Sequence, residues 1–336
     1  MKIKRSFVGY SIGVVALHVL GICLLLSSVS NHPTLLGLGF LAYTFGLRHA
    51  FDADHIAAID NTVRKLRQEA KNPVGVGFFF SLGHSTIVIL MALITTLAVQ
   101  WAQKSIPQLQ TLGGIVGTLV SAVFLFTIGF INLFVLMNIY QVFKKMRTVS
   151  LNQEQFEELL NSRGFLSRMI GPLFKLINKS WHIYPVGILF GFSFDTASEV
   201  ALLAISAGAA KSAIPFSGVL ALPIMFSAGM ALMDTTDGMF MTTAYNWAFA
   251  TPIRKVYYNL TITGLSVVAA LIIGLIEVIQ VLTPALGLNQ GVWAWLQNLD
   301  FNMMGYILVG LFVATWAISY FIWKFLHIER RWAASN

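Results

Sequence analysis

Long apolar runs separated by short polar links dominate the chain. Eight runs can be read, each long enough for the roughly 20 residues of helix that cross a bilayer. They cover residues 7–28, 34–60, 74–100, 112–143, 183–208, 214–240, 258–283 and 303–326. Continuous apolar runs are typical of transmembrane helices, whereas the strands of a membrane barrel alternate over about ten residues. The pattern predicts an all-α integral membrane protein with about eight transmembrane helices.

Composition supports this class. The 336 residues are 57% hydrophobic and 11% charged, whereas soluble domains carry about 25% charged residues. The single cysteine, Cys23, lies in the first run and excludes a disulfide framework or a thiolate metal cage.

Basic residues set the orientation, because Lys and Arg accumulate on the cytoplasmic side of a membrane protein. With the N-terminus inside, nineteen of the twenty-two Lys and Arg fall in cytoplasmic segments. The outer links hold only Lys104 and Lys211, and Arg48 lies within a run. We therefore expect both termini in the cytoplasm and a multi-pass protein of the bacterial cytoplasmic (inner) membrane, in contact with lipids. The net charge of +8 follows this topology, so no nucleic-acid partner is expected.

We expect one polytopic transmembrane domain over residues 1–336, with a cytoplasmic connector at about 144–182 between two four-helix halves. The alternative for the N-terminus is a signal peptide cleaved near Ser28-Val29-Ser30. The first run is longer than the apolar core of a typical signal peptide and contains His18, which favours a membrane helix.

The second run contains the most unusual chemistry, Arg48-His-Ala-Phe-Asp-Ala-Asp-His-Ile56. Each charge inside a bilayer costs about 2.5–3.5 kcal/mol on insertion scales, so such residues usually mark a binding site or ion pathway. If the run is one helix, His49, Asp52 and His55 share a face, and Asp54 lies about 140° from His49. Asp54 could then pair with Arg48, support an imidazole, or bind metal if the helix unwinds. Imidazole and carboxylate together predict a site for a divalent transition metal.

Three further runs carry polar motifs. His84 lies in the third run, Asp195 and Glu199 are helical neighbours in the fifth, and Asp234 and Asp237 lie in the sixth. Glu277, near the outer end of the seventh run, is expected at the membrane interface. The predicted metal ligands are His49, Asp52, Asp54, His55 and His84, and the predicted pathway or gating residues are Arg48, Asp195, Glu199, Asp234 and Asp237.

Four motifs resemble those of the nickel/cobalt transporter family of secondary permeases. They are His49-Ala-Phe-Asp-Ala-Asp54-His55, Leu82-Gly-His-Ser-Thr86, Gly191-Phe-Ser-Phe-Asp-Thr-Ala-Ser-Glu199 and Gly229-Met-Ala-Leu-Met-Asp-Thr-Thr-Asp-Gly238. The resemblance implies high-affinity, ATP-independent uptake of Ni²⁺ or Co²⁺, with the metal as transported substrate and neither a cofactor nor enzyme activity. It also implies that His49, Asp54 and His55 are central to recognition and transport.

Chemistry favours the same substrates. Neutral imidazole suits Ni²⁺, Co²⁺, Cu²⁺ and Zn²⁺, whereas an all-oxygen cage would suit Mg²⁺ or Mn²⁺. The chain contains no Gly-x4-Gly-Lys-Ser/Thr nucleotide loop, so no nucleotide partner is expected. A dication moving inward across 100 mV gains about 4.6 kcal/mol, so the membrane potential could drive uptake, with or without a proton partner.

Two alternatives stay open. Efflux of the same metals uses the same ligands, but efflux proteins often carry a His-rich cytoplasmic stretch, and the connector contains only His182. An intramembrane metalloprotease would also place His and Asp in helices, but its His-Glu-x-x-His motif is absent.

Overall fold

The computed structural model describes residues 2–97, 99–146, 177–192, 202, 208, 214–248 and 252–326. Its elements within these ranges are all helical. They are α1 Lys2–Val29, α2 Thr34–His49, α3 Ala53–Gln68, α4 Val76–Leu97, α5 Val99–Met146, the 3₁₀ turn η1 Ser180–Ile183, α9 Tyr184–Phe190, α11 Phe216–Ala248, α12 Pro252–Ala285, α13 Val292–Gln297 and α14 Phe301–Leu326.

Five of the described helices contain segments long and apolar enough to cross a membrane, and α14 contains a shorter one, Met303–Ser319. The five segments are Ser6–Val29, Val76–Ile94, Ile115–Met137, Phe216–Trp247 and Leu260–Ala285. The all-α membrane class is confirmed. Eight crossings and the cytoplasmic location of both termini stay predictions. Most of the connector and of the fifth predicted run lies outside the described residues.

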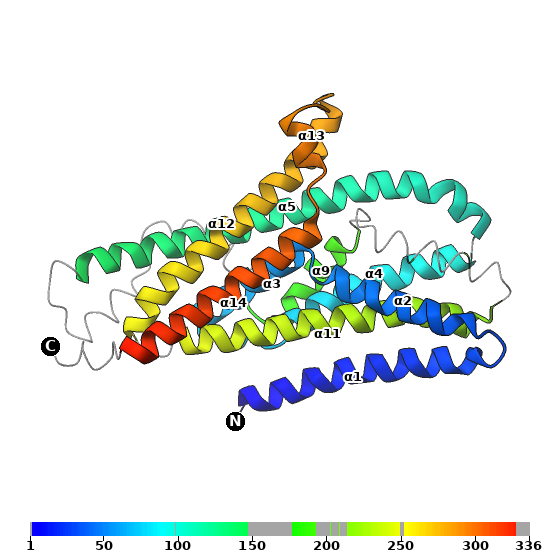
Figure 1. The fold of residues 1–336 in the computed structure, drawn as a ribbon, viewed down its shortest axis with the longest axis horizontal. Coiled ribbons are helices and arrows are strands. Elements are labelled where there is room, and N and C mark those ends of the chain that lie inside the picture. The colour runs from blue at the N-terminus through cyan, green and yellow to red at the C-terminus, as the bar shows by residue number, and fades with distance from the viewer. Residues whose placement is uncertain are drawn as a thin grey trace.

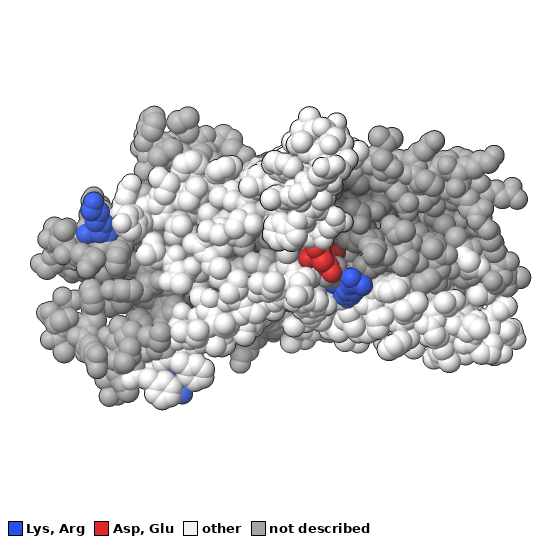
Figure 2. Space-filling model, turned by 45° about the horizontal axis from the view of Figure 1, so that its top comes forward, with Lys and Arg blue, Asp and Glu red and all other residues white. Residues whose placement is uncertain are grey.

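The long helices run roughly side by side, with α11 in the middle of the bundle (Figure 1). Helices α1, α2 and α4 pack along α11, and α5 packs along α12. The start of α1 and the end of α14 lie at the same end of the bundle, on the left in Figure 1. This arrangement agrees with the predicted topology. In Figure 2 the described residues of the visible face are nearly all white and so uncharged, as a lipid-facing surface requires, apart from a small group of charged residues near the middle and Lys or Arg at the left.

The second apolar run is not one helix, so of the two possibilities that the sequence left open, the interrupted helix is the one present. Helix α2 ends at His49, and α3 begins at Ala53. Asp52 has the extended conformation, φ −63° and ψ 141°, of a residue that precedes a helix, but its side chain makes no capping hydrogen bond. Gly305 of α14 lies so close to the Phe51 carbonyl that a Cβ there would overlap it. The contact with α14 therefore depends on glycine.

Helix α3 is polar but enclosed by protein. Thirteen of its sixteen residues are buried, because α4, α5, α11, α12 and α14 surround it. The helix continues to Gln68, and Arg64 and Lys65, counted above among the cytoplasmic basic residues, lie buried in protein. A polar helix avoids the cost of meeting lipid when neighbouring helices cover it.

Helix α5 has 48 residues, about 72 Å at 1.5 Å per residue, and its apolar segment Ile115–Met137 lies within the predicted run 112–143. One further expectation needs correction. Glu277 is not interfacial: it is 3% exposed and accepts a hydrogen bond from Ser121 Oγ at 2.7 Å. The pairing with α5 explains why this acid is tolerated inside the bundle.

Candidate metal centre

Three histidines from different segments converge in the interior of the bundle. His49 is the last residue of α2, His55 lies in the first turn of α3, and His84 lies midway along α4. Their exposed fractions are 2%, 0% and 2%. One ring nitrogen from each lies within 4.8 Å of the other two. The interruption between α2 and α3 lets two of these rings belong to different helices.

The spacing of the rings suits a shared cation. The Nε2 atoms of His49 and His84 are 3.1 Å apart. Two imidazole nitrogens, each about 2.0–2.1 Å from one ion, are about 2.8–3.4 Å apart when the angle between them is 90–110°. The ring centroid of His55 lies 4.7 Å from that of His49 and 4.9 Å from that of His84. Small rotations of these rings would therefore bring three nitrogens to one ion.

Two carboxylates lie beside the rings. His55 Nδ1 forms a hydrogen bond with Asp234 Oδ1 at 3.3 Å. His49 Nδ1 lies 2.9 Å from Asp52 Oδ2, an ion-pair distance without hydrogen-bond geometry. An Nδ1–H that donates to a carboxylate leaves the lone pair on Nε2, and this pairing is the usual support of a metal-binding histidine. Within the described part of the chain, His55 Nε2 has no hydrogen-bond partner. Its lone pair is therefore available to a ligand.

The other predicted site residues are placed differently. Asp54 Oδ1 accepts a hydrogen bond from the backbone N–H of His55 at 2.9 Å, which fits an acid in the first turn of a helix. Arg48 lies in the last turn of α2 and is exposed. Asp237 follows Asp234 by about one turn of α11, and its Oδ2 is buried. Asp195 and Glu199 lie outside the described residues.

Glycines allow the helices that carry the site to touch. A Cβ on Gly77 of α4 would overlap the backbone oxygen of Asp234 in α11. A Cβ on Gly46 of α2 would likewise overlap the backbone oxygen of Phe226. Small residues at such crossings are typical of membrane helices. Here they hold α2 and α4, which carry His49 and His84, directly against α11.

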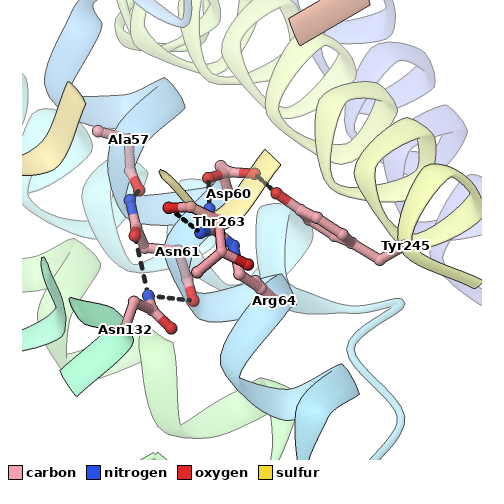
Figure 3. A network of polar contacts seen from close by, with 7 residues as sticks. All are labelled: Ala57, Asp60, Asn61, Arg64, Asn132, Tyr245 and Thr263. Carbon is pink, nitrogen blue, oxygen red and sulfur yellow. Dashed lines mark hydrogen bonds and ion pairs between the residues drawn. The ribbon is translucent and has the colours of Figure 1, made fainter. Parts of the chain in front are cut away.

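A second buried polar group, which the sequence reasoning missed, anchors α3 (Figure 3). Asp60 forms an ion pair with Arg64 and accepts a hydrogen bond from the Tyr245 hydroxyl. Arg64 also donates to the Thr263 carbonyl at 3.1 Å, and its guanidinium carbon lies 5.4 Å from the centre of the Tyr245 ring.

The same helix is linked to α5 by an amide pair, in which Asn132 Nδ2 donates to Asn61 Oδ1 at 2.9 Å (Figure 3). The spacing of Asp60 and Arg64, four residues apart, is the sequence signal that could have indicated a helix continuing past the apolar run.

Comparison with known proteins supplies independent information. A family model described as high-affinity nickel-transport protein matches residues 35–322. The nickel transporter NixA of Staphylococcus aureus is 54% identical, over 98% of both chains. The high-affinity nickel-transport protein NixA of Helicobacter pylori is 52% identical, over 94% of this chain and 96% of its own. The cobalt transport protein NhlF of Rhodococcus rhodochrous is 40% identical, over 90% of this chain and 88% of its own. No solved structure matches.

Proposed function

The chain belongs to the high-affinity nickel-transport protein family, and we propose that it carries Ni²⁺ into the cell through a site formed by His49, His55 and His84. The family resemblance noted from the four motifs is thereby confirmed. The observation that carries the proposed site is the convergence of three buried imidazoles in the bundle interior. Imidazole is a donor that suits Ni²⁺ and Co²⁺ and is a poor match for Mg²⁺ or Ca²⁺.

In this proposal, Asp52 and Asp234 hold the imidazoles of His49 and His55 with Nε2 directed inward. The contacts of 2.9 Å and 3.3 Å support this role. Water or a carboxylate would complete the coordination, and Asp54 remains the proposed further oxygen ligand. Arg48, Asp195, Glu199 and Asp237 are proposed to line or gate the path.

We propose Co²⁺ as a second substrate, because a relative is named a cobalt transport protein and the two ions prefer similar donors. Transport names among the relatives favour a permease over the intramembrane metalloprotease. Uptake is favoured over efflux because the membrane potential draws a dication inward, by about 4.6 kcal/mol per 100 mV.

The test is accumulation of ⁶³Ni in cells that produce the chain. His55→Ala should abolish accumulation at an unchanged amount of protein in the membrane. The matched control is His18→Ala, since His18 bonds Val14 and Tyr43 in the α1–α2 region, away from the three histidines, and this variant should keep uptake. Wild-type uptake by His55→Ala would overturn the proposed site. Faster loss of nickel from preloaded cells would instead establish efflux.

The energy source is tested in proteoliposomes. A potassium diffusion potential, negative inside, should drive ⁶³Ni entry without a pH gradient, because a moving dication responds to voltage directly. Entry that requires an imposed pH gradient would show that protons are coupled to transport.

A further inference from the structure

Two fully buried phenylalanines lie against the histidine rings. The Phe80 ring in α4 meets the His55 ring edge-on, with centroids 4.8 Å apart and planes at 88°. The Phe226 ring in α11 lies 5.6 Å from the His49 ring, with planes at 39°. Both phenylalanines are 0% exposed. The contacts place one aromatic ring beside each of two proposed ligands.

The two rings approach the histidines from opposite ends of the bundle. In the predicted orientation, α4 begins at the cytoplasmic side and α11 ends there. Phe80 precedes His84 by four residues, so it lies about 6 Å nearer the cytoplasm. The Phe226 backbone lies against Gly46, which precedes His49 by three residues in α2, so it lies about 4.5 Å nearer the outside than His49. The histidines therefore lie between an inner ring and an outer ring.

Each ring belongs to a different apolar cluster. Phe80 packs in a cluster that includes Ile56, Ile59 and Phe190. Phe226 packs in another, which includes Leu35 and Leu222. A divalent ion, which must keep or replace its waters, has no ligands in such packing. Since the three histidines are themselves at most 2% exposed, the structure represents a state closed towards both sides.

The backbones at both rings are already in contact with a neighbouring helix. A Cβ on Gly187 of α9 would overlap the backbone oxygen of Phe80, and a Cβ on Gly46 would overlap that of Phe226. These close crossings leave little room for the backbones to shift past one another. Rotation of the side chain is therefore the smallest movement that would open a path at either ring.

We propose that Phe80 is the inner gate and Phe226 the outer gate of the metal site. Displacing one ring admits or releases the cation while the other ring keeps the opposite side closed. This inference rests on the proposed function, because it treats the three histidines as the site that the cation must reach.

The test measures access to the site and does not depend on nickel transport. Cys23 is the chain's single cysteine. A protein with Cys23→Ser and His84→Cys therefore carries one thiol, at the proposed site, and its reaction rate measures access to that site. A charged, membrane-impermeant methanethiosulfonate is applied to intact cells and to inside-out vesicles, with chelator present. The thiol should react slowly from both sides. Phe226→Ala should speed the reaction at least tenfold from outside only, and Phe80→Ala at least tenfold from inside only.

Control variants distinguish the opening of a gate from a general loosening of helix packing. Phe78→Ala, on α4 but packed against Tyr10, should leave the thiol protected, as should Phe80→Leu and Phe226→Leu, which refill most of the space. If an alanine variant is lost from the membrane, the corresponding valine variant replaces it and should show the same sidedness. Unchanged rates in both gate variants, or acceleration from the wrong side, would overturn the proposal. A negative nickel-uptake result would count against the proposed function and leave this measurement interpretable.

Discussion

His55 and Asp234 are 179 residues apart in the chain, yet His55 Nδ1 lies 3.3 Å from Asp234 Oδ1, with both side chains fully buried. The pair joins the first turn of α3 to the middle of α11. A second imidazole–carboxylate pair, His49 and Asp52, is three residues apart in the chain, with His49 Nδ1 at an ion-pair distance of 2.9 Å from Asp52 Oδ2. Local sequence supplies one carboxylate–imidazole pair, and tertiary packing supplies the other.

Asp234→Asn should weaken nickel binding about 10–100-fold, the usual cost of losing a group that orients a metal-binding histidine. The asparagine oxygen can still accept the Nδ1–H bond, so Asp234→Ala should lose more affinity than Asp234→Asn. Titration calorimetry on the purified protein measures this order. Equal affinity in all three proteins would contradict the role assigned to Asp234.

Gly77→Ala should lower both stability and nickel affinity, because the new Cβ would overlap the backbone oxygen of Asp234 and push α4 away from α11. Overpacking of this kind costs typically about 1–3 kcal/mol. Gly37→Ala is the matched control, since no atom lies within 4 Å of its would-be Cβ. That control should be neutral or more stable, as Ala replaces Gly in a helix. Thermal unfolding in detergent compares the two, and equal losses would refute the crossing argument.

Arg64→Met should destabilise the protein by about 3–5 kcal/mol, because it leaves the buried Asp60 carboxylate without its ion-pair partner. The double variant Asp60→Asn, Arg64→Met should recover much of that loss, since no buried charge is left unpaired. Melting temperatures of the single and double variants are compared in one detergent. A double variant no more stable than Arg64→Met would mean that the pair is not the source of the cost.

The sequence was sufficient to predict the membrane class, and it singled out the three histidines that the structure brings together. Apolar runs of this length are typical of transmembrane helices. The free-energy cost of placing a charge in the membrane is high enough that such residues usually mark a site. The sequence left open that the helix of the second apolar run is interrupted, but it did not give the place. The segment Ala50–Asp52 contains neither Gly nor Pro, and part of its surroundings is the contact between Phe51 and Gly305 of α14.

The partners of the buried carboxylates could not be predicted from the sequence either. Helical periodicity placed Asp52 beside His49, but only packing brings Asp234 to His55. Arg64 was counted among the cytoplasmic basic residues, because Lys and Arg accumulate on that side, but its burial was not predicted. Its burial depends on Asp60, Tyr245 and Thr263, which lie on three different helices.

The most direct test of the central claim is X-ray absorption at the nickel edge of the purified, nickel-loaded protein. The three-histidine site predicts scattering from several imidazole rings around the metal. That scattering should disappear in a His49→Ala, His55→Ala, His84→Ala variant, together with high-affinity binding. A nickel shell of oxygen atoms alone, or a spectrum unchanged by the triple substitution, would contradict the account.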